Sequence, residues 1–355
     1  MRGLTWDHPR GYAPLDELTR LDHAGANPYG AVPEPIEWDR QPLAGFESEP
    51  IARLCETYDV LVIDHPGLGA ALDALVPMEE LFEPAELAGL AGLRFAGRSY
   101  ESYRLDGRQW ALPLDAAAQV AAARPGVRPP RTWPEVAGLA AGARMALCLG
   151  GPHAFLMFCA LCGGDFLDEQ SGERALELMA ELLALSDPEV SPLNPVGVLD
   201  AMTAGQVDFC PLLYGYVTYP LTFGDAPAWP GRPPGSVLGG TGLVVSRRRL
   251  DADRGSNRDA IRAHLLRLVS EPVQAELFPS VGGQPAARSV WTAEKTGTSF
   301  YRDTLATVEA AWIRPRFPGY IALQERSSAL IRDGLLARAP ARDLLKNLHE
   351  EWRTR

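Results

Sequence analysis

The sequence predicts an α/β protein with about two domains and a mostly parallel sheet. The chain has 355 residues, a length typical of two domains. Strand and helix signals alternate over the first 115 residues, as expected for repeated βα units and parallel pairing. The clearest buried-strand signal is Asp59–Ile63, where an apolar, β-branched run ends in polar residues and a proline.

The elements of the first third follow from short apolar runs bounded by Gly, Pro and Asn. Gly107–Asp115 indicates a strand interrupted by proline, which cannot donate to a sheet ladder. Before it we expect strand Leu4–Trp6, a helix around Pro14–Leu21, strand Ile36–Asp39, helix Glu49–Thr57, strand Asp59–Ile63 and a short helix beginning near Gly69.

The remaining elements are mainly helices. Thr132 is an expected N-cap, and Glu135 three residues later completes a pattern typical of a capping box. We expect helices at Val136–Ala143, His153–Cys162, Glu173–Leu185 and Val196–Ala204, strands at Val207–Leu213 and Leu238–Ser246, and further helices over the last hundred residues.

The charge of the chain restricts its partners. The net charge is −11, from 45 acidic and 34 basic residues, which argues against nucleic-acid binding because that needs a basic face. No apolar stretch reaches the roughly 18 residues that a membrane span requires, so we expect a protein that does not span a membrane. A small neutral or cationic molecule is the expected partner.

The start of the sequence bears on localisation. Residues 1–6 lead directly into a strand, without the charged segment, apolar segment and cleavage site of a secretory signal. We expect a cytoplasmic protein if Met1 is the native start, and a periplasmic or extracellular one if a signal peptide was removed.

The cysteines predict buried, reduced thiols. There are five of them, an odd number in apolar surroundings, which does not fit a disulfide framework. Cys159 and Cys162 form a C-x-x-C pattern, but its flanks are apolar, so a redox or zinc role is disfavoured.

The tripeptide Asp-His-Pro occurs twice, each time where a strand is expected to end. Asp7-His8-Pro9 follows Leu4–Trp6, and Asp64-His65-Pro66 follows Asp59–Ile63. In open α/β sheets, ligands lie at the carboxyl ends of strands. If the two strands are neighbours, two Asp and two His converge on one crevice; the alternative is that both copies simply form turns.

Four strings, in order and spread over nearly the whole chain, resemble the extracellular solute-binding proteins of ATP-driven importers, the family that includes maltose-binding protein. Gly107–Asp115 resembles the family's segment crossing between lobes, and 130–135 (PRTWPE) its helix start. Residues 163–167 (GGDFL) resemble the turn after the next helix, and 239–246 with 282–288 (GGQPAAR) resemble its return strand and later loop.

The resemblance implies a type II periplasmic-binding-protein fold. Each of two lobes would hold a mostly parallel five-stranded sheet flanked by helices, with the ligand in the cleft between them and hinge closure around it. The expected boundaries are 1–112 plus 238–292 for the N-terminal lobe, and 113–237 plus 293–355 for the C-terminal lobe.

The resemblance also implies a site, because it makes the first and third strands neighbours and places several later segments on the cleft. The expected ligand-binding residues are Trp6, Asp7, His8, Tyr12, Asp64, His65, Asp115, His153, Tyr214, Tyr216, Gly240, Thr241 and Arg316. Carboxylates and aromatic rings together favour a sugar, a polyol or a cation.

Two classes of function remain open from the sequence. One is a solute-binding protein that captures a small polar organic ligand for an ABC-type importer, with permease subunits as partners and no cofactor. The other is a cytoplasmic enzyme or sensor on the same fold, with His8, His65, Asp7 and Asp64 as acid and base groups. In a variant of the second, the same four residues ligate a metal such as Zn or Fe.

Overall fold

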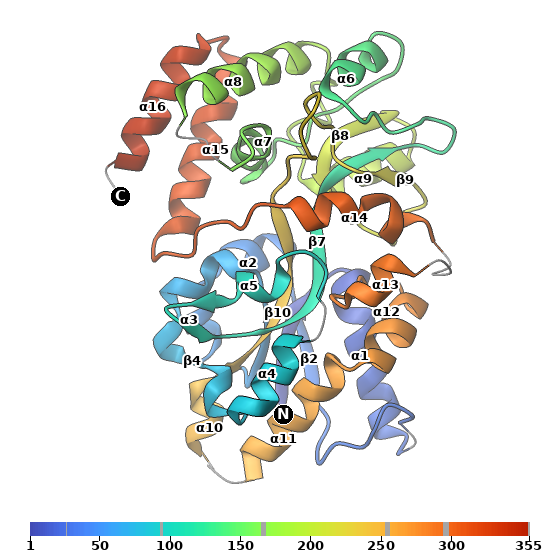
Figure 1. The fold of residues 1–355 in the computed structure, drawn as a ribbon, viewed down its shortest axis with the longest axis vertical. Coiled ribbons are helices and arrows are strands. Elements are labelled where there is room, and N and C mark those ends of the chain that lie inside the picture. The colour runs from blue at the N-terminus through green and yellow to red at the C-terminus, as the bar shows by residue number, and fades with distance from the viewer. Residues whose placement is uncertain (26, 93–94, 165–167, 253–255, 294–297, 354–355) are drawn as a thin grey trace.

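The computed structural model describes residues 1–355 except 26, 93–94, 165–167, 253–255, 294–297 and 354–355. It shows an elongated α/β protein with two lobes joined by two long strands, β7 and β10 (Figure 1). We call the half that holds strands β1–β4 the N-terminal lobe, and the half that holds β8 and β9 the C-terminal lobe. The predicted two-lobed α/β class is confirmed.

The strands form one sheet that passes through both lobes. Its order is β2-β1-β3-β10-β7-β8, with β4 paired to β10 and β9 paired to β7. The strands are β1 (Arg2–Trp6), β2 (Glu37–Gln41), β3 (Val60–Ile63), β4 (Leu75–Val76), β7 (Leu112–Ala123), β8 (Phe209–Tyr214), β9 (Thr222–Gly224) and β10 (Leu238–Ser246); β5 (Arg104–Leu105) and β6 (Arg108–Gln109) form a separate hairpin.

Parallel pairing is found in both lobes, but the ladders through the hinge are antiparallel. β1 pairs in parallel with β2 and with β3, which confirms that the two Asp-His-Pro strands are neighbours. In the C-terminal lobe, Met145 forms isolated parallel bridges to Phe209 and Ser186. β7 and β10 pair antiparallel to each other, and β8 and β9 pair antiparallel to β7, a detail that the sequence did not indicate.

Helices cover the sheet of the N-terminal lobe on both faces (Figure 1). They are α1 (Pro9–His23), α2 (Leu43–Ser48), α3 (Ile51–Leu54), the 3₁₀ turns η1 (His65–Ala70), η2 (Leu72–Ala74) and η3 (Met78–Glu80), α4 (Pro84–Gly92), α5 (Ser99–Ser102), α10 (Arg247–Ala252), α11 (Ser256–Leu268), the π-helical η4 (Val273–Leu277), α12 (Phe278–Ser280) and α13 (Arg288–Thr292).

The C-terminal lobe is built around one fully buried helix. Every residue of α7 (His153–Leu161) is buried, and α15 (Tyr320–Leu336) and α8 (Glu169–Ala184) pack against it. The other helices are α6 (Trp133–Ala140), α9 (Pro195–Thr203), α14 (Phe300–Ala310) and α16 (Ala341–Arg353). The start of α15 also contacts η1 of the opposite lobe, so this helix links the two.

Several predicted elements agree closely with the structure. β10 has the predicted bounds, and Thr132 caps α6 by accepting a hydrogen bond from the backbone N–H of Glu135. All five cysteines are free and buried, as expected. The predicted helix Glu49–Thr57 is wrong in extent: only α3 (Ile51–Leu54) lies within it, with Pro50 as its N-cap, while α2 already ends at Ser48.

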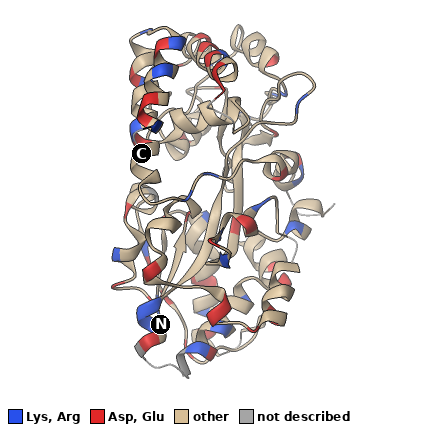
Figure 2. Ribbon diagram, turned by 60° about the vertical axis from the view of Figure 1, so that its left-hand side comes forward, with Lys and Arg blue, Asp and Glu red and all other residues tan. Residues whose placement is uncertain are grey.

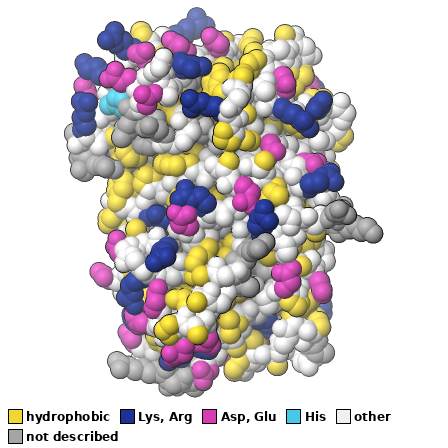
Figure 3. All heavy atoms as spheres, in the orientation of Figure 1, with side chains coloured by type: hydrophobic (Ala, Val, Ile, Leu, Met, Phe, Trp, Pro, Cys, Tyr) yellow, Lys and Arg dark blue, Asp and Glu magenta, His cyan; other side chains and the backbone are white. Residues whose placement is uncertain are grey.

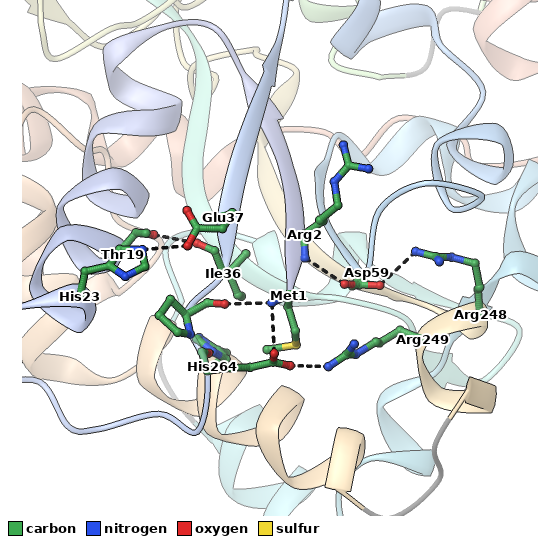
Figure 4. Close-up of polar contacts among 12 residues, drawn as sticks. Met1, Arg2, Thr19, His23, Ile36, Glu37, Asp59, Arg248, Arg249 and His264 are labelled. Carbon is green, nitrogen blue, oxygen red and sulfur yellow. Dashed lines mark hydrogen bonds and ion pairs between the residues drawn. The ribbon is translucent and has the colours of Figure 1, made fainter. Parts of the chain in front are cut away.

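Polar contacts fix β1 at the base of the N-terminal lobe (Figure 4). The backbone N–H of Arg2 donates to Oδ2 of Asp59 at 2.9 Å, and Arg248 donates to Oδ1 of the same carboxylate at 3.0 Å. Nearby, Thr19 of α1 donates to the carbonyl of Ile36 at 2.8 Å. These contacts set the register of β1 and therefore the position of its other end.

Charged residues lie mainly on the outer helices, and both signs are interspersed (Figures 2 and 3). Hydrophobic side chains gather between the two halves on the left of Figure 3, where α15 begins in Figure 1. None of the helices in the described part of the chain has the length and apolar character needed to cross a membrane.

Candidate ligand-binding site between the lobes

A pocket of about 410 Å³ lies between the N-terminal lobe and the start of α15. Its lower wall comes from the ends of β2 and β3 and from α2, α3 and η1, and its upper wall from residues 317–325. The side chains best suited to hold a ligand are the polar Gln41, Ser48, Asp64 and Glu325 and the aromatic Phe46, Phe317 and Tyr320. This volume is in the range of pockets for small molecules.

Asp64 reaches the pocket because β3 ends there. All four residues of β3 are buried, and the chain then turns into η1 with Asp64 as the N-cap and a proline in the first turn. Oδ1 of Asp64 accepts a hydrogen bond from the backbone N–H of His65 at 2.9 Å. The carboxylate is thereby held at the edge of the sheet.

Arg314 holds the same carboxylate from the opposite side. Its Nη2 donates to both oxygens of Asp64, at 2.8 and 2.6 Å, and its side chain is only 4% exposed. Burial alone would raise the pKa of Asp64, but Arg314 and the hydrogen bond from His65 outweigh it and lower the pKa to about 2. The pair is therefore fully ionised at neutral pH and carries no net charge.

A second buried ion pair joins α1 to the hinge. Nε and Nη2 of Arg10 donate to the two carboxylate oxygens of Asp115, each at 2.7 Å. Nη1 of Arg10 donates to the carbonyl of Gly215 in the C-terminal lobe at 3.1 Å. Burial acts against the charged guanidinium, but Asp115 outweighs it and raises the pKa of Arg10. Arg10 thus binds the hinge and the opposite lobe together.

An aromatic cluster continues this contact between the lobes. The rings of Trp6 and His8 stack with centroids 5.3 Å apart, and Tyr216 of the C-terminal lobe meets His8 edge-on at 4.7 Å. Tyr219 lies 6.2 Å from His8. Phe46 stacks on Trp6 at 5.7 Å and also lines the pocket. The cluster therefore borders the pocket through Phe46.

Two buried polar atoms without a hydrogen-bond partner among the described residues lie beside the pocket. The hydroxyl of Tyr320 belongs to a residue that lines it, and Nε of Arg314 belongs to the arginine that binds Asp64. Buried polar groups are nearly always hydrogen-bonded, so these atoms indicate a place where a ligand or water completes the bonding.

The first Asp-His pair has different surroundings. Asp7 is 59% exposed, and its Oδ1 lies 3.8 Å from Nη1 of Arg40, which itself stacks over the ring of Tyr12 at 3.4 Å. Asp7 and Tyr12 thus belong to a surface group that does not line the pocket. His8 caps α1, with Nδ1 accepting from the backbone N–H of Arg10 at 3.1 Å.

The expected convergence of two Asp and two His, and with it the metal alternative, is wrong. Among the described residues, which include all four, no three His, Cys, Asp or Glu are grouped in a way that could hold a metal ion. Asp7 turns to Arg40, Asp64 is paired with Arg314, and His65 is 0% exposed. Burial and the nearby Arg314 lower the pKa of His65 to about 4. Burial and Arg10 lower the pKa of His8 to about 4 as well.

The remaining predicted residues lie at the hinge or behind the pocket. His153 begins α7, its ring 5.8 Å from that of Tyr214, and burial lowers its pKa to about 3. Thr241 is the register partner of Asp115 in the hinge ladder. Gly240 beside it has φ +92°, and an added Cβ would lie 2.5 Å from the carbonyl oxygen of Asp115, so this crossing requires glycine.

Arg316 lies against the N-terminal lobe instead of the pocket. Its Nη1 donates to the carbonyls of Glu101 and Ser102, at 3.1 and 2.9 Å. The pocket residues that sequence reasoning missed are Gln41, Phe46, Phe317 and Glu325. For Phe317 and Glu325, Pro318 and Gly319 mark a place where a helix can start. Gln41 and Phe46 lie in segments without a distinctive pattern.

The fold is shared with solved structures of solute-binding proteins. A maltose-bound T. maritima MalE3 is 18% identical and matches with a TM-score of 0.80 over 100% of this chain and 99% of that one. An Agrobacterium radiobacter K84 ABC transporter solute-binding protein in complex with ribitol is 18% identical, with a TM-score of 0.76 over 99% and 97% of the two chains. A Thermus thermophilus maltotriose-binding protein is 19% identical, with a TM-score of 0.74 over 99% and 98%.

No known family profile matches the sequence, and no curated protein does so. The similar structures are ABC-type solute-binding proteins, several of them solved with sugars or polyols. At these identities the comparison establishes the fold. The chain therefore has the two-lobed fold of the maltose-binding-protein type.

Proposed function

We propose that this protein is a solute-binding protein that captures a small, uncharged polyhydroxylated ligand, a sugar or polyol, between its lobes for an ABC-type importer. The observation that carries the proposal is the pocket at the end of β3, where carboxylates and a tyrosine hydroxyl without a partner among the described residues lie beside aromatic rings. We place the lobe boundaries at 1–112 plus 238–292 and at 113–237 plus 293–355.

The charges of the site favour an uncharged ligand. Two of the three carboxylates among the expected ligand-binding residues, Asp64 and Asp115, are already neutralised by arginines. A charged ligand that pairs with Asp64 or Asp115 would have to break one of these buried pairs, which leaves a buried charge uncompensated. A ligand hydroxyl does not require either ion pair to break, because it can donate a hydrogen bond to Asp64 while Arg314 stays bound to the same carboxylate.

The pocket can hold both faces of such a ligand. Glu325 and Asp64 offer acceptors, while Tyr320 offers a hydroxyl that has no partner among the described residues. Phe46 and Phe317 offer flat surfaces for the apolar face of a sugar ring. Of the residues predicted from the sequence, we propose Asp64 for direct ligand contact and Trp6, His8, Asp115, Tyr216, Gly240 and Thr241 for holding the lobes together.

Thermal-shift screening tests the ligand class. We expect at least one sugar or polyol from a panel that includes maltose, maltotriose, ribitol, mannitol and tagatose to raise the unfolding midpoint, because a ligand that binds only the folded state stabilises it. A panel in which organic acids or amines alone raise the midpoint would overturn the proposal.

A matched pair of tyrosine variants tests the pocket. Tyr320→Phe removes the hydroxyl without a partner and is expected to weaken binding of the ligand about fivefold while leaving thermal stability unchanged or higher. Tyr301→Phe removes a hydroxyl that donates to the carbonyl of Gly283 at 2.9 Å outside the pocket, and is expected to lower stability and leave affinity unchanged. Equal affinities for Tyr320→Phe and the parent would contradict the assignment.

A further inference from the structure

A second pocket, of about 400 Å³, lies on the C-terminal lobe and shares no lining residue with the pocket between the lobes. Its floor is the end of α7 and its walls are the start of α6, part of α8, the loop 229–236 and Trp312. Nothing in the proposed transport function uses it.

Three indoles form its apolar walls: Trp133, Trp229 and Trp312. The rings of Trp133 and Trp229 lie with centroids 6.4 Å apart at an angle of 46°. Nε1 of Trp229 donates to the carbonyl of Leu161 at 3.4 Å, which fixes this ring on the end of α7. Three of the eight tryptophans of the chain thus line one pocket.

The loop that closes the pocket is anchored at both ends. At its start, the backbone N–H of Ala228 donates to the carbonyl of Arg131 at 2.9 Å. At its end, the backbone N–H of Trp312 donates to the carbonyl of Ser236 at 2.8 Å. Prolines at 230, 233 and 234 further restrict the backbone between these anchors. The pocket is therefore formed before any ligand enters.

The charged side chains among the described lining residues are all positive. Arg174 and Arg232 line the pocket, and the described lining residues include no Asp or Glu, although the chain as a whole has a net charge of −11. The guanidinium of Arg174 lies 5.1 Å from the ring centroid of Trp229. Within the described part of the chain neither arginine forms an ion pair, so both can pair with an incoming anion.

We propose that this pocket binds a small organic anion with a flat apolar body, of the aryl carboxylate type. The flat body stacks against the indoles, and the carboxylate is bound by the two arginines, whose planar guanidinium groups match its geometry. Aromatic rings can also attract a cation, but the positive charges of the two arginines would repel a cationic ligand here. The proposal is independent of the proposed function, since the two pockets have no residue in common.

The test compares two probes of the same shape and different charge. Titration calorimetry with 2-naphthoate is expected to show saturable binding with one site per chain, whereas the uncharged 2-naphthamide binds at least about tenfold more weakly. Equal affinity for the two probes, or no saturable binding of 2-naphthoate, would overturn the proposal.

Variants then locate the site. Arg174→Gln and Arg232→Gln replace exposed side chains, so the fold is retained, and each is expected to weaken 2-naphthoate binding about threefold, with about tenfold for both together. Arg20→Gln, an exposed arginine of α1, and Tyr320→Phe in the other pocket are expected to leave it unchanged. If the double variant binds 2-naphthoate as the parent does, the probe binds elsewhere and the assignment is wrong.

Discussion

The tripeptide Asp-His-Pro follows two neighbouring parallel strands, and its two copies have different environments. After β1, Asp7 is exposed and His8 caps a helix within an aromatic cluster. After β3, Asp64 is clamped by a buried arginine and His65 is fully buried. The difference arises from what each strand end faces: Arg40 at the surface in one case, Arg314 from the opposite lobe in the other. An identical local sequence thus lies at the surface in one copy and beside the pocket between the lobes in the other.

The largest expected difference between the copies is in stability. Asp64→Ala leaves the charge of Arg314 buried without its partner and is expected to lower the free energy of unfolding by about 3 kcal/mol. Urea denaturation followed by circular dichroism measures this. Comparable losses for Asp64→Ala and Asp7→Ala would show that the two carboxylates have equivalent environments.

The next effect is the pH dependence contributed by His65, whose pKa is lowered like that of His8 in the other copy. Its pKa is lowered to about 4 in the folded protein, from an ordinary value near 6.5, so the unfolded chain binds the proton more readily. Stability is therefore retained above pH 6.5 and lost as the pH falls toward 4, by about 3 kcal/mol for this group. Urea midpoints of His65→Gln are expected to depend less on pH over this window than those of the parent. An unchanged slope for His65→Gln would contradict this.

A smaller effect is expected at His8. His8→Ala removes the side-chain acceptor that caps α1 together with the stacking on Trp6, and is expected to cost about 1.5 kcal/mol. His8→Asn restores a capping acceptor, so it is expected to recover part of that loss. If the two variants are equally stable in thermal unfolding, the capping bond contributes nothing and only the stacking matters.

The smallest effect is expected at Asp7. Asp7→Asn removes an exposed charge 3.8 Å from Arg40 and is expected to change the free energy of unfolding by less than about 0.5 kcal/mol. The same urea experiment measures it, and a loss above about 2 kcal/mol would mean that Asp7 is held more tightly than its exposure indicates.

The sequence predicted the elements better than it predicted the site. Apolar runs and caps located β10 and the start of α6, since these signals are local. The two ion pairs of the site join residues 105 and 250 positions apart, and no local pattern encodes such a pairing. Asp64, which the resemblance placed at the cleft, lines the pocket and Asp7 does not, because equal tripeptides need not have equal environments. Phe46 was missed because α2 has no pattern that sets it apart.

Calorimetric titration of the best ligand from the thermal-shift screen into the parent, Asp64→Asn and Asp7→Asn shows whether the ligand binds at the end of β3. Asn keeps the size of the side chain, and circular dichroism verifies that each variant is folded at the temperature used. We predict one site per chain in the parent and in Asp7→Asn with affinities within about twofold, and binding at least about tenfold weaker in Asp64→Asn. Equal binding by Asp64→Asn and the parent would contradict the assignment of the ligand site to the end of β3.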